Sequence, residues 1–152
     1  MGDRFPRGVD RALRRAGWFP GRRVDTTPWR DAVDGITMHP AARAFLAEFG
    51  GLAVDVHGFG RTAAKEPFEV DPALCAGEED RFREWSEILG RSLYPLGELD
   101  HGRFFLGIDD RGSLYLVVDW LAVFDGPADA GLIALCRGVM PRPVRQQRCS
   151  GC

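Results

Sequence analysis

The sequence of 152 residues has the length of one domain, and its 45% hydrophobic and 28% charged content is that of an ordinary globular protein. The longest apolar run, residues 114–124, is interrupted by Asp119 and is shorter than the ~20 residues that a membrane span requires. Residues 1–17 lack the apolar segment of a secretory signal, so we expect a cytoplasmic protein with no membrane partner.

The net charge of −2 is unevenly distributed along the chain. Residues 1–50 hold nine arginines and six acidic residues, a balance of +3. Residues 66–135 hold fifteen acidic residues and five arginines, a balance of −10. An acidic segment of this size repels nucleic acid and attracts a basic partner, so we expect no direct binding of nucleic acid.

Apolar residues at helical spacing predict a first helix over residues 8–16 that ends at Gly17. The chain continues as "GWFPGRRVDT", residues 17–26, and the mixture of aromatic and arginine side chains is typical of grooves that bind nucleic acid. The acidic middle of the chain argues against that function. We therefore interpret Trp18 and Phe19 as anchors that pack the first helix against a sheet.

Residues 22–28 are expected to be extended, because a residue before proline avoids the helical region, as Thr27 does before Pro28. We expect either Arg22 or Arg23 to form a buried bidentate pair with a carboxylate, and the other to face water.

A second helix is predicted over residues 40–49, followed by a stop at two glycines. Its apolar face is expected to contain Ala41, Ala44, Phe45 and Phe49. Alternation then predicts a strand over residues 52–59 and a short strand over residues 66–70, in which Pro67 favours an edge position.

Three acidic residues, Glu78, Glu79 and Asp80, mark the start of a helix within residues 75–90. Negative charge is favourable there because the helix macrodipole is positive at its N-terminus. The buried stripe of this helix is expected to consist of Phe82, Trp85, Ile88 and Leu89.

Consecutive strands are predicted over residues 92–99, 103–119 and 121–124, with a hairpin turn at "DDRG", residues 109–112. A closing helix is predicted within residues 126–139, and its inward residues are expected to be Leu132, Ile133 and Cys136.

This order of elements predicts a single α+β domain, a mainly antiparallel sheet flanked by helices. We place the domain at residues 8–144. Residues 1–7 are expected to be a flexible N-terminus, and residues 145–152 a disordered tail rich in arginine and cysteine.

Motifs for catalysis or metal binding are weak. "GFGRTA", residues 58–63, matches a dinucleotide fingerprint, but Pro67 follows too soon for the helix that this fingerprint requires, so we interpret it as a connecting loop. The histidines lack metal-ligand spacing and are interpreted as surface or capping residues: His39, His57 and His101. We expect no catalytic residue, no metal and no cofactor.

The four cysteines divide into two kinds. Cys75 and Cys136 lie in apolar segments and are expected to be small buried residues. Cys149 and Cys152 form a C-x-x-C at the end of the chain, without the following helix of a redox site or the second ligand pair of a zinc site.

Four segments in order, residues 13–25, 39–54, 96–117 and 132–139, resemble the SUKH superfamily of bacterial immunity proteins, specifically its third immunity group. The family motifs match here at Gly17, Trp18, Pro20, Arg22, Glu48, Phe49, Gly50, Gly51 and Gly112. The resemblance implies an α+β fold and a non-enzymatic protein of a polymorphic toxin system. Such a protein binds a cognate toxin, often a nuclease or nucleic-acid deaminase, and neutralises it by stoichiometric occlusion.

Toxins that act on nucleic acid are commonly basic where they contact phosphates. We therefore hypothesise that acidic side chains form part of the toxin-facing surface: Glu78, Glu79, Asp80, Asp100, Asp109 and Asp110. The alternative, that they form a solvated face, stays open. A second function also stays open, a SUKH-like regulatory domain that binds a protein or ligand with no toxin partner. A monomer is the default expectation.

Overall fold

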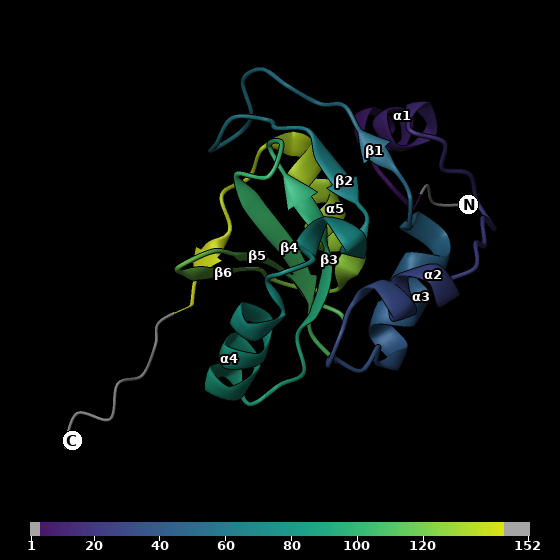
Figure 1. The fold of residues 1–152 in the computed structure, drawn as a ribbon. Helices are drawn as coiled ribbons and strands as arrows, with labels where there is room; N and C mark the ends of the chain where they lie inside the picture. Colours follow the sequence, from purple (N-terminus) through teal and green to yellow (C-terminus); the bar gives the residue numbers. More distant parts are fainter. Residues whose placement is uncertain (1–3, 145–152) are drawn as a thin grey trace.

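The computed structural model describes residues 4–144, which form a seven-stranded antiparallel sheet with helices on both faces (Figure 1). The strands follow one another in space in chain order, and each pairs antiparallel with the next. They are β1 (Ala53–Val54), β2 (Phe68–Val70), β3 (Tyr94–Leu99), β4 (Phe104–Ile108), β5 (Leu114–Val117), β6 (Leu121–Phe124) and β7 (Arg142–Pro143).

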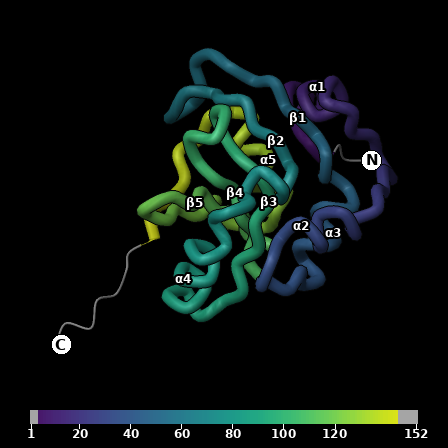
Figure 2. The backbone as a smooth tube through the Cα atoms, viewed as in Figure 1, coloured from purple at the N-terminus to yellow at the C-terminus, as the bar shows by residue number. Residues whose placement is uncertain are grey.

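The helices within residues 4–144 are α1 (Arg7–Arg15), α2 (Thr27–Ala32), α3 (Pro40–Phe49), α4 (Glu79–Leu89) and α5 (Ala128–Arg137), with a 3-10 turn at Pro72–Cys75. The backbone view shows α1, α2 and α3 grouped on one side of the molecule, while α4 lies apart from them (Figure 2). The α+β architecture predicted from the sequence is confirmed. Among the described residues, no helix is long and apolar enough to cross a membrane.

Strand β5 shows how the sheet separates two hydrophobic cores. Leu114 and Leu116 belong to the larger core, which also contains residues of α1, α3 and α5. Tyr115 and Val117 belong to the smaller core, to which α4 contributes Phe82. Successive side chains of a strand point to opposite faces, so four consecutive buried residues fill both cores.

Helix α2 begins at Thr27, within the segment that Pro28 predicts to be extended. Pro28 lies in the first turn of α2, where its missing N–H has no helical partner to lose. The backbone N–H of Thr27 donates to Asp25 Oδ1 at 3.0 Å, which fixes the chain at the start of the helix. The extended interpretation of residues 27 and 28 is therefore wrong.

The buried face of α3 is rotated relative to the prediction. Phe45 and Phe49 are buried as expected, but Ala44 is exposed, and Ala42 and Leu46 complete the buried face. These four buried residues have the spacing i, i+3, i+4, i+7 of a helix face. In α4, Phe82 is buried but Ile88 is 40% exposed, so the predicted stripe is too wide.

The first strands are shorter than predicted. Only Ala53 and Val54 of residues 52–59 form a strand, and β1 pairs outside β2, so β2 is not an edge strand. Pro67 precedes β2, where its missing N–H interrupts no strand pairing, and its carbonyl accepts from Asp100 N at 2.7 Å. The short strand β7 was not predicted.

The chain is packed into the core from Phe5 onward. Phe5 is 1% exposed, although residues 1–7 were expected to be flexible. The guanidinium of Arg4 pairs with Asp129 on α5 at 2.7 Å and also with Glu48 on α3. The expected tail, residues 145–152 with Cys149 and Cys152, lies outside the described residues.

Trp18 is an anchor of the first helix, whereas Phe19 is not. Trp18 is 4% exposed and stacks on Phe49, with ring centroids 6.2 Å apart and an interplanar angle of 16°. Phe19 is 53% exposed, so its predicted role is wrong. Arg22 donates to the backbone carbonyl of Glu48 at 2.7 Å instead of a carboxylate, because that carbonyl lies near the end of α3. Arg23 is exposed, as one of the two arginines was expected to be.

Candidate partner-binding surface

The three acidic residues predicted at the start of α4 lie close together in the structure, and Asp119 lies beside them. Glu78 is the N-cap residue, and the first turn contains Glu79 and Asp80. The Arg81 guanidinium lies 3.6 Å from both Glu78 Oε1 and Asp119 Oδ1, so the turn between β5 and β6 joins this cluster. The side chains of Asp80 and Asp119 are 94% and 95% exposed, and each lies beside an arginine, Asp80 beside Arg83 and Asp119 beside Arg81.

Asp100 lies at the same end of the sheet, in the turn between β3 and β4. Its carboxylate is 3.4 Å from Arg103, which also lies 3.8 Å from Glu66 Oε1. The Arg103 guanidinium sits over the Phe104 ring, 5.1 Å from its centroid. Since β4 and β5 are antiparallel, the β3–β4 and β5–β6 turns lie at one end of the sheet.

Asp109 does not belong to any partner surface, because its side chain is 0% exposed. One carboxylate oxygen accepts from the backbone N–H groups of Arg111 (2.9 Å) and Ser113 (3.0 Å). The other accepts from the Tyr115 hydroxyl at 2.7 Å and lies 3.4 Å from Arg91. The residue closes the predicted hairpin, and its hypothesised role in binding is therefore wrong.

Asp110 is exposed but lies at the other end of the sheet, in the β4–β5 turn. Its carboxylate accepts from the backbone N–H of Ser92 at 3.4 Å. The six acids proposed from the sequence therefore occupy three places: the start of α4, the β3–β4 turn and the β4–β5 hairpin.

An exposed tryptophan lies between the first two of these places. Trp120 is 49% exposed, and its ring contacts Phe104 with centroids 5.7 Å apart. Together with Met140, which is 61% exposed, these residues line a cavity of about 360 Å³ whose floor includes Leu99 and Leu116. We call this patch the Trp120 surface: Phe104, Trp120 and Met140, flanked by Glu66, Glu78, Arg81, Asp100, Arg103 and Asp119.

Glu66 is the unusual charged residue of the Trp120 surface. Desolvation, reinforced by the nearby Asp100 carboxylate, raises the pKa of Glu66 above its ordinary value. Its Oε2 atom is buried and has no hydrogen-bond partner among the described residues. Leaving a buried polar atom unpaired costs on the order of 1–3 kcal/mol.

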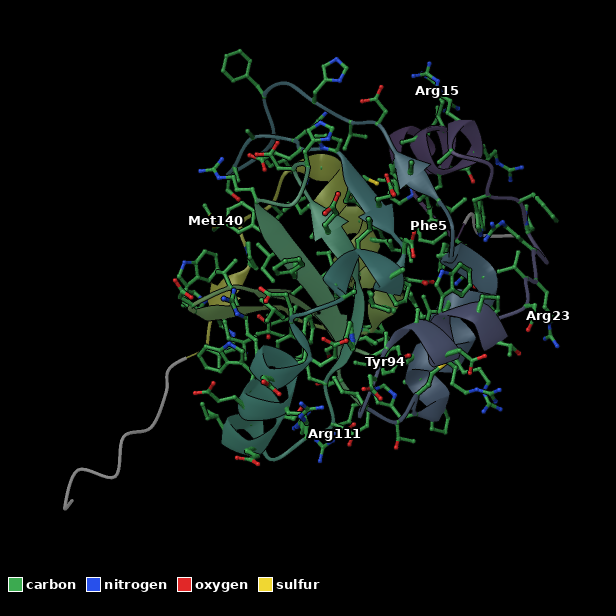
Figure 3. All side chains as sticks on the ribbon, in the orientation of Figure 1. Phe5, Arg15, Arg23, Tyr94, Arg111 and Met140 are labelled. Atoms are coloured by element: carbon green, nitrogen blue, oxygen red, sulfur yellow. The ribbon has the colours of Figure 1, made fainter. Side chains whose placement is uncertain are left out.

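The family-motif residues mainly hold the fold and lie away from the Trp120 surface. Arg23, beside the first motif, and Met140 are at opposite sides of the molecule (Figure 3). Glu48 accepts from the Trp18 indole N–H at 3.0 Å. A Cβ at Gly50 would lie 2.5 Å from the Trp29 ring, so only glycine fits against that ring. Gly17, Gly51 and Gly112 have positive φ angles, and Pro20 is exposed.

The histidines show no common site. His39 is buried and caps α3, because its Nδ1 accepts from Ala42 N at 3.1 Å. Its Nε2 is 3.2 Å from the carbonyl oxygen of Ile108. His57 and His101 are exposed. Within residues 4–144, no group of three or more His, Cys, Asp or Glu residues is arranged to hold a metal ion.

The described residues thus form an α+β fold that carries an exposed aromatic patch beside charged side chains. A family model described as SUKH-3 immunity protein matches residues 5–138. The chain therefore belongs to the SUKH-3 immunity protein family. Comparisons with curated proteins and with solved structures gave no match.

Proposed function

We propose that this chain is the immunity protein of a bacterial polymorphic toxin system and that it neutralises its cognate toxin by stoichiometric binding through the Trp120 surface. The observation that carries the proposal is the exposed Trp120 over an apolar cavity whose lining includes Glu66 and Arg103, next to Asp119 of the acidic cluster. Family membership supports immunity as the general role.

The composition of the Trp120 surface matches that of a binding hot spot. Tryptophan is enriched among residues that cost about 2 kcal/mol or more when truncated at an interface. The flanking acids of this surface, Glu66, Glu78, Asp100 and Asp119, outnumber Arg81 and Arg103 by four to two. Such an excess of negative charge steers a basic partner and selects against acidic ones. A nuclease or nucleic-acid deaminase has such a basic face where it contacts phosphates. Covering that face in a cytoplasmic complex occludes the active site without any catalysis by the inhibitor.

Co-expression tests the proposal in cells. Bacteria that carry the toxin domain encoded beside the gene for this chain should grow when the wild-type chain is present. Trp120→Ala should lose protection, whereas Phe19→Ala should keep it. Phe19 is a matched control because its exposure, 53%, is close to the 49% of Trp120. Loss of protection in both variants, or in neither, would exclude the Trp120 surface.

The acidic cluster is tested by charge reversal. Glu78→Lys/Asp80→Lys should slow toxin association by about tenfold and weaken its dependence on salt. The control Asp31→Lys/Asp110→Lys also reverses two acidic residues, and both of them are exposed and lie away from the Trp120 surface. If both double variants associate like the wild type, these acids form a solvated face.

The second function is a regulatory SUKH-like domain that binds a cellular protein or ligand and has no toxin partner. It is favoured if no toxin gene lies beside the gene for this chain and if the chain protects against no toxin.

A further inference from the structure

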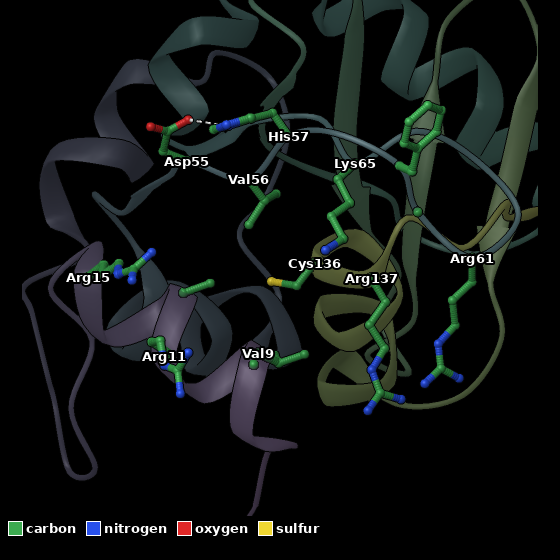
Figure 4. A pocket seen from close by; sticks show the side chains of 14 residues that line it. Val9, Arg11, Arg15, Asp55, Val56, His57, Arg61, Lys65, Cys136 and Arg137 are labelled. Atoms are coloured by element: carbon green, nitrogen blue, oxygen red, sulfur yellow. Dashed lines mark ion pairs between the residues drawn. The ribbon is translucent and has the colours of Figure 1, made fainter.

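A second concave site, separate from the Trp120 surface, lies between α1, α5 and the loop that joins β1 to β2 (Figure 4). Its volume is about 610 Å³. Five cationic side chains line it: Arg11, Arg15, Arg61, Lys65 and Arg137. The close-up shows the two arginines of α1 on one wall and Arg61 and Arg137 on the other. We call this site the basic pocket.

The charge of the basic pocket is not neutralised within residues 4–144. None of its five cations forms an ion pair with a carboxylate in that part of the chain. The single carboxylate of the lining, Asp55, lies 3.7 Å from His57. Five cations against one carboxylate give a local balance of +4, in a chain whose net charge is −2.

The wall of the basic pocket is a fixed structure. Backbone N–H groups of Arg61, Thr62 and Ala63 donate to the carbonyls of Arg137 and Gly138 at 2.9–3.0 Å. The loop also approaches the end of α5 very closely, since a Cβ at Gly60 would lie 2.6 Å from Gly138 Cα. These contacts fix the loop that carries Arg61 and Lys65 against the end of α5, which carries Arg137.

The chemistry of the lining indicates a ligand with several phosphate oxygens. Four of the five cations are arginines, whose planar guanidinium groups bind phosphate oxygens in pairs. The floor is apolar and includes Val9, Val56 and Cys136, which suits the less polar part of a ligand. Phe59, also part of the lining, is fully exposed and offers a ring on which a base can stack.

We propose that the basic pocket binds a nucleoside di- or triphosphate. Its volume is within the range of about 300–1,000 Å³ that is usual for small-molecule sites. Cations on two facing walls surround a compact polyanion, whereas a nucleic-acid strand requires a basic track along the surface. This proposal does not depend on the toxin-binding function.

Binding of ATP to the full-length chain, measured by calorimetry without added divalent cation, tests the proposal. ATP and inorganic tripolyphosphate should bind the wild type, ATP more tightly, and adenosine should not bind detectably. The variant Arg15→Gln/Arg137→Gln removes one cation from each wall and should weaken ATP binding by about 100-fold, a factor of about ten for each lost charge-assisted contact. The control Arg23→Gln/Arg43→Gln removes two exposed arginines outside the pocket and should bind ATP like the wild type.

Both double variants should unfold at the same temperature as the wild type. An unchanged unfolding temperature shows that a loss of ATP binding does not come from a loss of folding. The proposal is overturned if the wild type does not bind ATP, or if the two double variants lose ATP binding equally. It is also overturned if a single-stranded oligonucleotide or a glutamate-rich peptide binds the pocket arginines more tightly than ATP does. That result would make the pocket a site for a macromolecule.

Discussion

Truncating Trp18 tests whether the motif around residues 14–26 belongs to the core or to an interface. Trp18 packs between two aromatic rings, stacked on Phe49 and edge-on to Phe5 with centroids 5.3 Å apart. Truncation of a buried tryptophan to alanine costs about 3–5 kcal/mol. The change also removes the hydrogen bond to the partly exposed Glu48, so we expect Trp18→Ala to lower the free energy of unfolding by about 4 kcal/mol.

That loss is a large fraction of the roughly 5–15 kcal/mol by which a domain is stable. Urea unfolding followed by circular dichroism measures it directly. Trp18→Phe keeps a ring in the core and loses only the indole N–H and some area, so it should cost about 1–2 kcal/mol. Phe19→Ala should change stability by less than about 0.5 kcal/mol, because that side chain is half exposed. Unchanged stability of Trp18→Ala together with lost partner binding would refute the assignment of Trp18 to the core.

Three further outcomes are expected from buried polar and thiol groups. Asp109→Ala should lower the free energy of unfolding in urea by about 3–5 kcal/mol, because the N–H groups of Arg111 and Ser113 and the Tyr115 hydroxyl lose their acceptor. The control Asp110→Ala should lower it by less than about 1 kcal/mol. Native Cys75 and Cys136 should react with iodoacetamide at pH 8 far more slowly than after denaturation, as mapped by mass spectrometry, since burial raises the pKa of each thiol to about 12. Stability should be constant from pH 7 to 8.5 and fall above pH 9, because the unfolded chain loses thiol protons there while the folded chain keeps them. Burial raises the pKa of Tyr94 to about 12 and adds to this fall; rising stability above pH 9 would contradict it.

The regular parts of the fold could be predicted because their signals are local. Helices α1, α3, α4 and α5 follow from apolar spacing and end residues, and the β4–β5 hairpin follows from its turn residues. Helix α2 and strand β7 could not, because each is short. In α2, Pro28 lies in the first turn, where proline is compatible with a helix, although proline in sequence usually argues against one. Strand β7 has two residues and is defined only by its pairing with β6.

The candidate site was only partly predictable, because the positions of charged residues in the sequence do not show which of their side chains are exposed in the fold. Asp109 and Asp110 are adjacent, yet one side chain is buried in the hairpin and the other is exposed. Trp120 lies in the apolar run of residues 114–124, whose composition predicts buried strands. Its position in the β5–β6 turn, directly after Asp119, is the signal that could have marked it as exposed. The basic pocket combines residues far apart in sequence, from Arg11 to Arg137, and becomes visible only in three dimensions.

Calorimetric titration of the full-length chain with its cognate toxin domain tests the central claim most directly. We predict one toxin bound for each chain, a dissociation constant about 30-fold weaker or more for Trp120→Ala, and an unchanged value for Phe19→Ala. No complex with the wild type, or equal binding by wild type and Trp120→Ala, would contradict the account.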